Sequence, residues 1–492
     1  MNSKLRLGIK PVYLLLVLAF VAYLVLALRV DIPDWDALCY IMNAKTLLGK
    51  EAYFEWHRPI LWPFLIAIFG GSELAAKLLG VFLATFTVYA IYLLSKEMFD
   101  EWTGIYSSAI FMVIPLIQYW AYRMYTSIPM IGLSAMAFYF LVRYTKQKKD
   151  RGKEVDLYLF FLFSALAYLM RYVGLMTLFV GLFYLVLIKK INKKNVKYIL
   201  YGLVIFSLIL SPWLYFNYVN TGDPLYSPKI AKAQMDRVAP TQLDFYFRKW
   251  GVTFTYPLTV LVVIGLLFFY FRDLKVKDSI VIKNKEYLLA LLIFFSYFLY
   301  FQAFLNLKLT RYLIPCMLGW SILSGKGLKD LVSLFKGKEA YLRYGSIVVL
   351  LLIFVGGTYL NMGSIMHCGS DVDELSSFLN SLDGNGASTL WPYMNYYSDM
   401  RVKWIPHTYG ELENDTKTLG VRYVIVTEHP IEPTWATTHF FDSNGNWTLL
   451  KTFDICLGRI GIYEYKGNVS GDIVEIEDPL SGKNFVPLRF FP

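Results

Sequence analysis

The chain has 492 residues, 56% of them hydrophobic, and a formal net charge of +11 at pH 7. Soluble domains contain about 45–50% apolar residues, and here the excess forms long apolar blocks separated by Lys-rich stretches, as in membrane proteins. Because the positive charge lies mainly in these short stretches, it indicates membrane topology and not a nucleic-acid partner. No phosphate-binding glycine loop or dinucleotide fingerprint occurs, which argues against ATP or a nucleotide sugar as substrate.

Eleven apolar blocks are predicted to be membrane-spanning helices, since about 20 apolar residues cover a hydrocarbon core of about 30 Å. The predicted spans are 11–29, 74–94, 104–120, 127–142, 157–170, 172–188, 198–216, 254–271, 287–305, 312–325 and 344–360. The first block resembles a signal peptide because three basic residues precede it. We interpret it as a span, because ten blocks follow and no small-residue cleavage site is evident.

The basic stretches predict which loops are cytoplasmic, because Lys and Arg concentrate on that side. They are the amino terminus and the loops around 146–153, 189–197, 272–285 and 326–343. The apolar stretch Leu157–Ile188 lies between two of them, so it must cross an even number of times, as a hairpin with Arg171 at its tip. The same reasoning predicts an extracytoplasmic location for loops 30–73, 121–126, 217–253 and 306–311 and for the tail 361–492.

The fold class predicted is therefore an α-helical polytopic membrane protein with about 11 transmembrane helices. Residues 1–360 form the transmembrane domain, and its outer loops 30–73 and 217–253 form the site. Residues 361–492 form a small extracytoplasmic α/β domain, because apolar and polar residues alternate in its sequence. The segment Pro59–Gly71 is apolar but too short to span, which favours an interfacial or re-entrant helix.

Cysteines and glycosylation sequons give weaker indications about the tail. The four cysteines show no Cys-x-x-Cys pair and no metal-ligand spacing. A Cys368–Cys456 disulfide and two free thiols are both compatible with an external tail. Sequons occur at Asn414, Asn446 and Asn468; they indicate an external surface only if they are used, and chance occurrence is the simpler explanation.

The first outer loop concentrates carboxylates, among them Asp34 and Asp36. Helical spacing places Asp36, Tyr40 and Ala44 on one face. Helix capping alone is the other interpretation of these aspartates, since either could cap the helix that begins there. A second cluster, Glu55-Trp-His57-Arg58-Pro, follows in the same loop.

Arg171 lies within an apolar stretch, where an arginine costs about 2.5–3.5 kcal/mol at mid-bilayer and usually has a partner or ligand. Snorkelling to the interface is the alternative. Arg58, Arg171 and Arg311 all reach the same predicted side from distant parts of the chain. Because guanidinium groups bind phosphate with a planar pair of donors, one carboxylate with several arginines predicts base catalysis beside a lipid phosphate.

Several segments in order resemble one family of membrane enzymes. They are Asp36-x-x-x-Tyr40-x-x-x-Ala44, Arg58-Pro59 before Leu61-Trp62-Pro63, Thr126-Ser127-Ile128-Pro129, Leu169-Met170-Arg171-Tyr172-x-Gly174, Pro212-Trp213-x-x-x-Asn217-Tyr218-x-x-Thr221-Gly222-x-Pro224 and Arg311-Tyr312-x-x-Pro315. Together, over about residues 10–360, they resemble the GT-C glycosyltransferases. The most similar branch is that of the dolichyl-phosphate-mannose–protein mannosyltransferases and the lipid A aminoarabinose transferase.

The basic loops predict a cytoplasmic amino terminus, and the lack of a retrieval motif together with the loop chemistry favours the plasma membrane of a prokaryote. The resemblance implies an enzyme whose site is extracytoplasmic. It would transfer a sugar, with inversion, from a polyprenyl (dolichyl or undecaprenyl) phosphate to a hydroxyl of a protein, a lipid-linked glycan or a lipid. By position, Asp36 matches the family's catalytic carboxylate, and Arg58, Arg171 and Arg311 match basic residues near the donor phosphate. The expected partners are the lipid-linked sugar donor, the acceptor and membrane lipid. A nucleic-acid partner is not expected.

Two positions depart from the family pattern. The common Asp-Glu pair is here Asp36-Ala37, and Ser127 stands where the family often has Asp. The candidates for a supporting role are Asp34, Tyr40, Glu55, His57 and Ser127. One carboxylate suffices for the reaction, since a polyprenyl phosphate leaves without protonation and needs charge stabilisation instead. No metal or other cofactor is required, although a phosphate and an aspartate together can bind a divalent cation.

The alternative function is a transporter or flippase of lipid-linked oligosaccharide. That class usually shows repeat symmetry and charged residues along a path at mid-bilayer. The sequence shows no convincing internal repeat, and its charges gather at one predicted face. A non-catalytic membrane protein is a third interpretation, in which the acidic and basic motifs coincide by chance. We therefore favour a glycosyltransferase.

Overall fold

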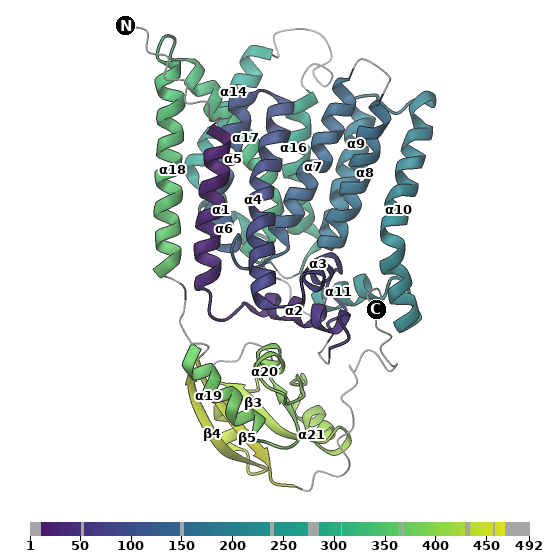
Figure 1. The fold of residues 1–492 in the computed structure, drawn as a ribbon, viewed down its shortest axis with the longest axis vertical. Helices are drawn as coiled ribbons and strands as arrows, with labels where there is room; N and C mark the ends of the chain where they lie inside the picture. Colours follow the sequence, from purple (N-terminus) through teal and green to yellow (C-terminus); the bar gives the residue numbers. More distant parts are fainter. Residues whose placement is uncertain are drawn as a thin grey trace. The chain divides into compact units, whose positions relative to one another are not determined.

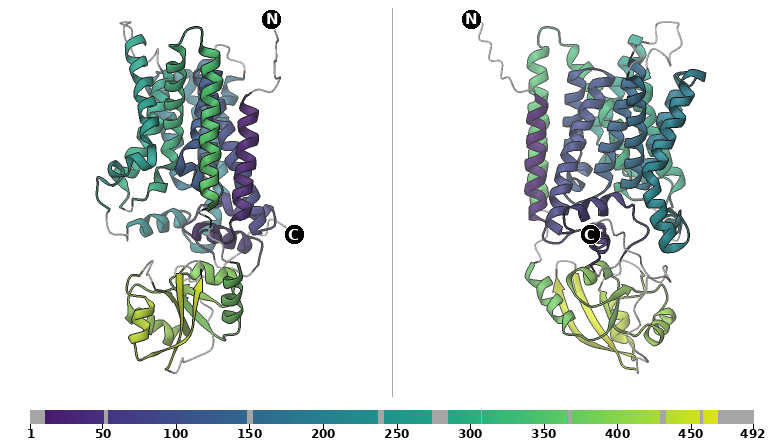
Figure 2. Two further views of the ribbon diagram at one scale, coloured as in Figure 1. Left: turned by 90° about the vertical axis from the view of Figure 1, so that its left-hand side faces the viewer. Right: turned by 45° about the vertical axis from the view of Figure 1, so that its right-hand side comes forward.

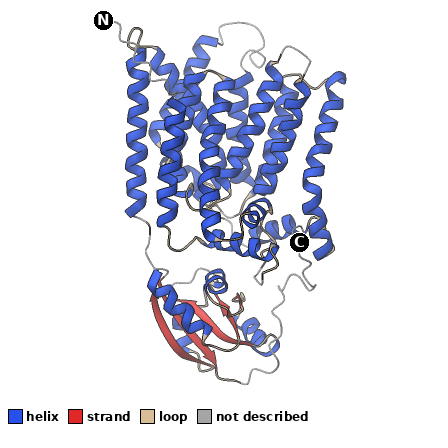
Figure 3. Ribbon diagram, viewed as in Figure 1, coloured by secondary structure: helices blue, strands red, loops and turns tan. Residues whose placement is uncertain are grey.

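The computed structural model describes residues 11–50, 54–147, 152–236, 241–273, 285–306, 308–363, 365, 369–428, 433–455 and 458–467. The chain divides into two compact units. The helical unit comprises Met1–Arg29 and Trp56–Ser364, and the sheet-containing unit comprises Val30–Glu55 and Ile365–Pro492. Helices make up the described part of the first unit, while all the described strands belong to the second (Figure 3).

Long helices stand side by side in the helical unit (Figures 1 and 2). They are α1 (Pro11–Arg29), α4 (Glu73–Met98), α5 (Glu101–Val113), α7 (Ser127–Lys146), α8 (Lys153–Met170), α9 (Leu175–Leu187), α10 (Lys193–Thr221), α14 (Tyr256–Asp273), α16 (Lys285–Phe304), α17 (Met317–Ser333) and α18 (Glu339–Gly363). Shorter helices connect them: α3 (Leu61–Ile68), α6 (Pro115–Trp120), α11 (Tyr226–Asp236), α12 (Phe245–Arg248), α13 (Trp250–Phe254) and the 3-10 turns η1 (Tyr172–Gly174) and η2 (Thr310–Cys316).

Six helices in the described ranges are long and apolar enough to cross a membrane, namely α1, α4, α7, α10, α16 and α18. Two shorter apolar stretches, Tyr172–Leu187 and Tyr256–Phe268, accompany them. Each of the eleven predicted blocks falls on a helical segment. The predicted fold class, an α-helical polytopic membrane protein with a small C-terminal α/β part, is confirmed.

One predicted span is not continuous, because the block 104–120 contains a proline. α5 ends at Val113 and α6 begins at Pro115, with Ile114 extended between them at φ −63°, ψ 120°. The ring of Pro115 disfavours the α conformation at the preceding residue, and its missing N–H suits the first turn of a new helix. The helix is therefore interrupted between α5 and α6.

Glycines allow α17 to pack closely against two neighbouring helices. A Cβ on Gly325 would lie 2.6 Å from the backbone nitrogen of Ser107 in α5. A Cβ on Gly327 would overlap the carbonyl of Leu261 in α14. Because backbone atoms cannot move aside as a flexible side chain can, these positions require glycine.

The sheet-containing unit holds α2 (Trp35–Leu47), α19 (Gly369–Asn380), α20 (Trp391–Tyr397), α21 (Tyr409–Thr418) and α22 (Thr438–Ser443). Its strands are β1 (Asn385–Ser388), β2 (Val402–Trp404), β3 (Val421–Thr427), β4 (Trp447–Ile455) and β5 (Gly458–Tyr465). They form one mixed sheet of order β2-β1-β3-β5-β4, parallel from β2 to β3 and antiparallel beyond. The alternating segments 423–426 and 461–465, from which the α/β tail was predicted, lie in β3 and β5.

Two apolar clusters cover the sheet. In the first, Leu38, Cys39 and Met42 of α2 pack with residues of α19, α20 and the strands. The second combines strand residues with Leu412 of α21 and Phe441 of α22. The first outer loop was predicted to fold with residues 1–360, whereas its α2 contributes to the core formed by the C-terminal residues. Shared burial of apolar side chains is the physical reason for this division.

Candidate functional site

Arg171 lies at the turn of a helical hairpin, as predicted. α8 ends at Met170, Arg171 is extended at φ −160°, ψ 131°, and η1 leads directly into α9. A Cβ on Gly174 would lie 2.7 Å from the backbone nitrogen of Tyr168 and would overlap the carbonyl of Ala167. The glycine therefore permits the tight reversal that places Arg171 at the hairpin tip, where its side chain is half-buried.

Arg171 and Arg311 come together around two tyrosine rings. The guanidinium carbon Cζ of Arg171 is 4.9 Å from the ring centroid of Tyr125 and 5.8 Å from that of Tyr312. The corresponding distances from Arg311, which lies in η2, are 5.6 and 6.0 Å. Two of the three predicted arginines therefore share one aromatic environment, although they are far apart in the sequence.

Two aromatic residues of this environment, Trp120 and Tyr125, lie outside the motifs that the sequence indicated, whereas Tyr312 belongs to one of them. Trp120 has its ring centroid 4.6 Å from that of Tyr125 and 5.5 Å from Cζ of Arg311. Both residues belong to the run Trp120-Ala-Tyr-Arg-Met-Tyr125, which begins at the last residue of α6 and ends just before α7. An arginine among closely spaced aromatics directly before α7 is the available signal. In a chain with 38 Tyr and 37 Phe, that signal is easily passed over.

Arg58 lies in the loop that precedes α3 and is 8% exposed. In the same loop, Trp56 packs its ring against Phe216 at the end of α10, with centroids 5.6 Å apart. Its ring also meets Tyr226 of α11 edge to face at 5.8 Å. The loop that carries Arg58 is therefore packed against the α10–α11 corner. This corner contains the sequence motif of residues 212–224, which includes Asn217.

Asp36 lies in the first turn of α2, and Asp34 occupies the N-cap position. Both side chains are half-buried. Within the described loop, the side chain of Asp34 does not form a capping hydrogen bond with the first turn of α2. Tyr40, which shares the predicted helical face with Asp36, is 4% exposed. The position of Asp36 is thus fixed by a helix most of whose other residues are buried.

Tyr393 of α20 adjoins these aspartates. The rings of Trp35 and Tyr393 meet edge to face with centroids 6.2 Å apart. Burial raises the pKa of the Tyr393 phenol far above its ordinary value, and the nearby charges of Asp34 and Asp36 act in the same direction. The phenol therefore stays protonated beside the carboxylates. Sequence reasoning could not find it, because nothing local connects α20 with α2.

The remaining candidates have structural surroundings of their own. Asn43 holds the backbone of Glu55 through two hydrogen bonds. Its side-chain amide donates to the Glu55 carbonyl (3.1 Å), and its side-chain oxygen accepts from the Glu55 N–H (2.7 Å). His57 is half-buried. Ser127 is fully buried, and among the described residues its hydroxyl has no hydrogen-bond partner. Over the described ranges, no three His, Cys, Asp or Glu side chains are grouped so as to hold a metal ion.

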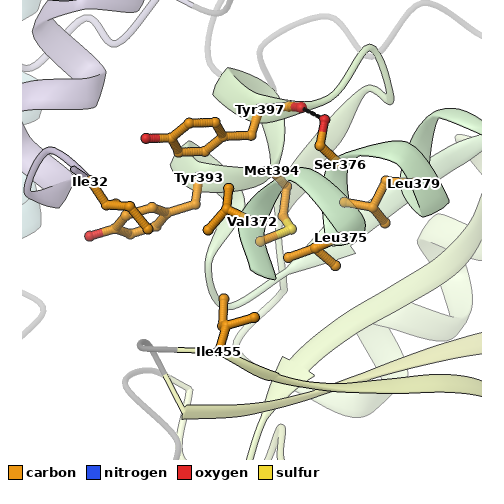
Figure 4. Close-up of a pocket in the computed structure, with 9 residues that line it drawn as sticks. All are labelled: Ile32, Val372, Leu375, Ser376, Leu379, Tyr393, Met394, Tyr397 and Ile455. Carbon is orange, nitrogen blue, oxygen red and sulfur yellow. Dashed lines mark hydrogen bonds between the residues drawn. The ribbon is translucent and has the colours of Figure 1, made fainter. Parts of the chain in front are cut away.

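An apolar pocket opens in the sheet-containing unit, and Tyr393 forms part of its wall (Figure 4). It is lined by Ile32, Val372, Leu375, Ser376, Leu379, Tyr393, Met394, Tyr397 and Ile455. The hydroxyl of Ser376 donates to the Tyr397 carbonyl. Cys368 and Cys456, the cysteines of the hypothetical disulfide, lie outside the described residues, as does Asn468; Asn414 lies in α21, and Asn446 directly precedes β4.

Comparison with known proteins gives one family match. Residues 57–216 match the family described as dolichyl-phosphate-mannose-protein mannosyltransferase. Among curated proteins, none matches the chain. The matched segment contains Arg58, Ser127 and Arg171, and it excludes Asp36 and Arg311.

Several solved structures share the fold at low sequence identity. ArnT from Cupriavidus metallidurans, bound to undecaprenyl phosphate, has a TM-score of 0.66 at 11% identity, over 94% of this chain and 99% of that one. The oligosaccharyltransferase AglB from Archaeoglobus fulgidus was solved in complex with an inhibitory peptide and a dolichol-phosphate. Its TM-score is 0.57 at 12% identity, over 92% of this chain and 74% of that one. The mycobacterial arabinofuranosyltransferase AftD gives 0.54 at 11% identity, over 92% of this chain and 41% of that one.

These neighbours and the matched family are GT-C glycosyltransferases, so the fold of this chain is the GT-C fold. Within that class, the family match and the similarity to ArnT confirm the predicted resemblance to the branch of protein mannosyltransferases and ArnT.

Proposed function

We propose that this protein is a membrane glycosyltransferase that transfers a sugar from a polyprenyl phosphate to a hydroxyl group. The donor is a dolichyl- or undecaprenyl-phosphate-linked sugar, and the acceptor is a protein, a lipid-linked glycan or a lipid. ArnT was solved with undecaprenyl phosphate and AglB with a dolichol-phosphate and a peptide, which supports a lipid-phosphate donor. The reaction takes place on the extracytoplasmic face of the plasma membrane.

The reaction is a single displacement at the anomeric carbon. The acceptor oxygen forms a bond to that carbon while the bond to the phosphate oxygen breaks, so the configuration inverts. Asp36 takes the proton of the attacking hydroxyl. The polyprenyl phosphate leaves with the bonding electron pair and needs no protonation, because the arginines stabilise its growing negative charge. Arg58, Arg171 and Arg311 fill this role.

The observation that carries the proposal is the convergence of Arg171 and Arg311 at Tyr125 and Tyr312. Two half-buried guanidinium groups that contact the same rings repel each other. A phosphate compensates this repulsion, with one negative charge in the donor diester and a second that develops on the leaving polyprenyl phosphate. A phosphate ester at a membrane surface is the matching ligand for such a pair. The family match over Arg58 and Arg171 supports the same assignment.

The proposal is tested with the purified full-length protein in detergent. Polyprenyl-phosphate sugars differing in sugar and polyprenol are incubated with hydroxyl-bearing peptide, glycan and lipid acceptors, and the products are identified by mass spectrometry. We expect transfer from at least one donor, with an inverted anomeric configuration by NMR. If no donor is consumed and the same lipids instead cross the bilayer of vesicles containing the protein, the chain is a flippase.

A further inference from the structure

Tyr125 contacts both arginines, although it has no acid, base or phosphate-binding role in the proposed reaction. Cζ of Arg171 lies 4.9 Å and Cζ of Arg311 5.6 Å from its ring centroid. The two guanidinium carbons are therefore no farther apart than these two distances combined. Tyr125 contacts both positive charges that are proposed to hold the phosphate, at shorter distances than Tyr312 does.

The ring has an electrostatic reason to be there. Two guanidinium groups at this separation repel each other, more strongly where water is scarce. The face of an aromatic ring carries partial negative charge and attracts cations within about 6 Å. A ring shared by two arginines thus offsets their repulsion and holds both in place before an anion arrives.

The surrounding structure fixes the ring. Tyr125 is 4% exposed and packs against Trp120, with ring centroids 4.6 Å apart. The preceding residue, Met124, has φ +56°, in the left-handed region that non-glycine residues seldom adopt. The turn before α7 therefore directs Tyr125 at a set angle, and its ring is a rigid element between a hairpin tip and η2.

We propose that Tyr125 is a positioning residue that sets the separation of the Arg171 and Arg311 guanidinium groups to fit a single phosphate. This inference rests on the proposed function, because the phosphate is that of the polyprenyl donor. The aromatic ring performs the role, so the phenolic hydroxyl is dispensable. Loss of the ring weakens recognition of the phosphate without removing a group that takes part in the chemistry.

The test compares Tyr125→Phe, which keeps the ring, with Tyr125→Leu, which removes it. Tyr119→Leu is the matched control, because the Tyr119 ring packs on Arg123 instead, 4.1 Å from its Cζ. Binding of undecaprenyl phosphate to each purified full-length variant is measured directly, and undecaprenol serves as the probe without charge. Thermal unfolding of each variant is recorded in the same detergent.

We expect Tyr125→Phe and Tyr119→Leu to bind undecaprenyl phosphate within about twofold of the wild type. Tyr125→Leu should weaken its binding about three- to thirtyfold while leaving undecaprenol binding unchanged. In the transfer assay, the loss should appear in the donor KM and spare kcat. A purely structural role would lower binding of both lipids and kcat together.

Other results overturn the inference. Equal binding by the wild type and Tyr125→Leu removes Tyr125 from the phosphate site, and a loss in Tyr125→Phe assigns the effect to the hydroxyl. If Tyr125→Leu does not fold, Tyr125→Met replaces it in the test, because methionine fills the space without a ring. If neither variant folds, Tyr125 is a structural residue. If the wild type itself does not bind undecaprenyl phosphate, the proposed function is wrong. If the wild type binds it and Tyr125→Leu binds it equally well, only the role of Tyr125 is wrong.

Discussion

Trp35 and Trp391 meet edge to face, with ring centroids 5.8 Å apart. Trp35 opens α2 and directly precedes Asp36, whereas Trp391 opens α20 in the C-terminal part of the chain. Such aromatic pairs contribute about 0.5–1.5 kcal/mol beyond the burial of their surface. The helix that carries the proposed catalytic base is thus anchored by residues of the sheet-containing unit.

Trp391→Ala should lower kcat about tenfold or more, because α2 loses an anchor next to Asp36. Truncation of a buried tryptophan also costs about 3–5 kcal/mol of stability, so activity is measured per folded molecule after thermal unfolding has been recorded. The donor KM should stay near the wild-type value, since the arginines belong to the helical unit.

Phe441→Ala is the matched control for that variant. Phe441 is 1% exposed and packs in the second cluster, against Trp447 and Tyr463 at 5.4 Å each. The Phe441→Ala variant should lose about as much stability as Trp391→Ala, whereas its kcat per folded molecule should stay at the wild-type value. An equal fall of kcat in both variants would show that the anchor acts through general stability alone.

Arg171→Ala and Arg311→Ala should each raise the donor KM about tenfold to a hundredfold, since each removes a charged hydrogen-bonding group from the phosphate. Because both guanidinium groups contact Tyr125 and Tyr312, their effects should be coupled, and the double variant should lose less than the product of the single losses. Arg143→Ala, whose guanidinium lies near Tyr139 and Phe140 in α7, is the control. Strictly multiplicative losses would contradict a shared phosphate.

Gly327→Ala should destabilise the helical unit by about 1–3 kcal/mol, because its methyl group would overlap the Leu261 carbonyl and push α17 away from α14. Gly345→Ala in α18 is the matched control, since no atom lies within 4 Å of the added Cβ. Alanine also favours a helix over glycine there. Thermal unfolding in detergent measures the stability of both variants. An equal loss of stability in the two would mean that helix packing at Gly327 is loose.

Much of the helical unit could be predicted from the sequence because hydropathy is a local property. The apolar blocks coincide with helices, and the charge of Arg171 within a long apolar stretch marked the hairpin tip. Pro115 was visible too, yet the block 104–120 was interpreted as continuous. Its break depends on the conformation of Ile114, which a hydropathy average does not register.

The partner of α2 could not be predicted, because ten of its thirteen residues are buried. A helix that is apolar on most sides has no polar face to show which side meets the core. Likewise, the contact of Tyr125 with two arginines depends on tertiary packing between the turn before α7, the tip of the α8–α9 hairpin and η2. Neither relationship leaves a periodic pattern in the sequence.

The predicted topology can be tested at the two ends of α10, whose 29 residues extend about 44 Å at 1.5 Å per residue. Leu225→Cys, beyond its C-terminal end and 48% exposed, should react with an impermeant thiol reagent added outside intact cells. Lys193→Cys at the other end should react only after permeabilisation. The native cysteines are replaced by Ser first. The reverse labelling pattern would invert the topology.

The central claim is that Asp36 is the general base of a polyprenyl-phosphate-dependent transfer, and Asp36→Asn tests it most directly. The amide keeps the shape of the side chain but cannot accept the proton, so kcat should fall about 10²- to 10⁴-fold while undecaprenyl phosphate still binds. Asp31→Asn, an exposed aspartate in the same loop, should keep wild-type turnover. Transfer by Asp36→Asn at the wild-type rate would contradict the account.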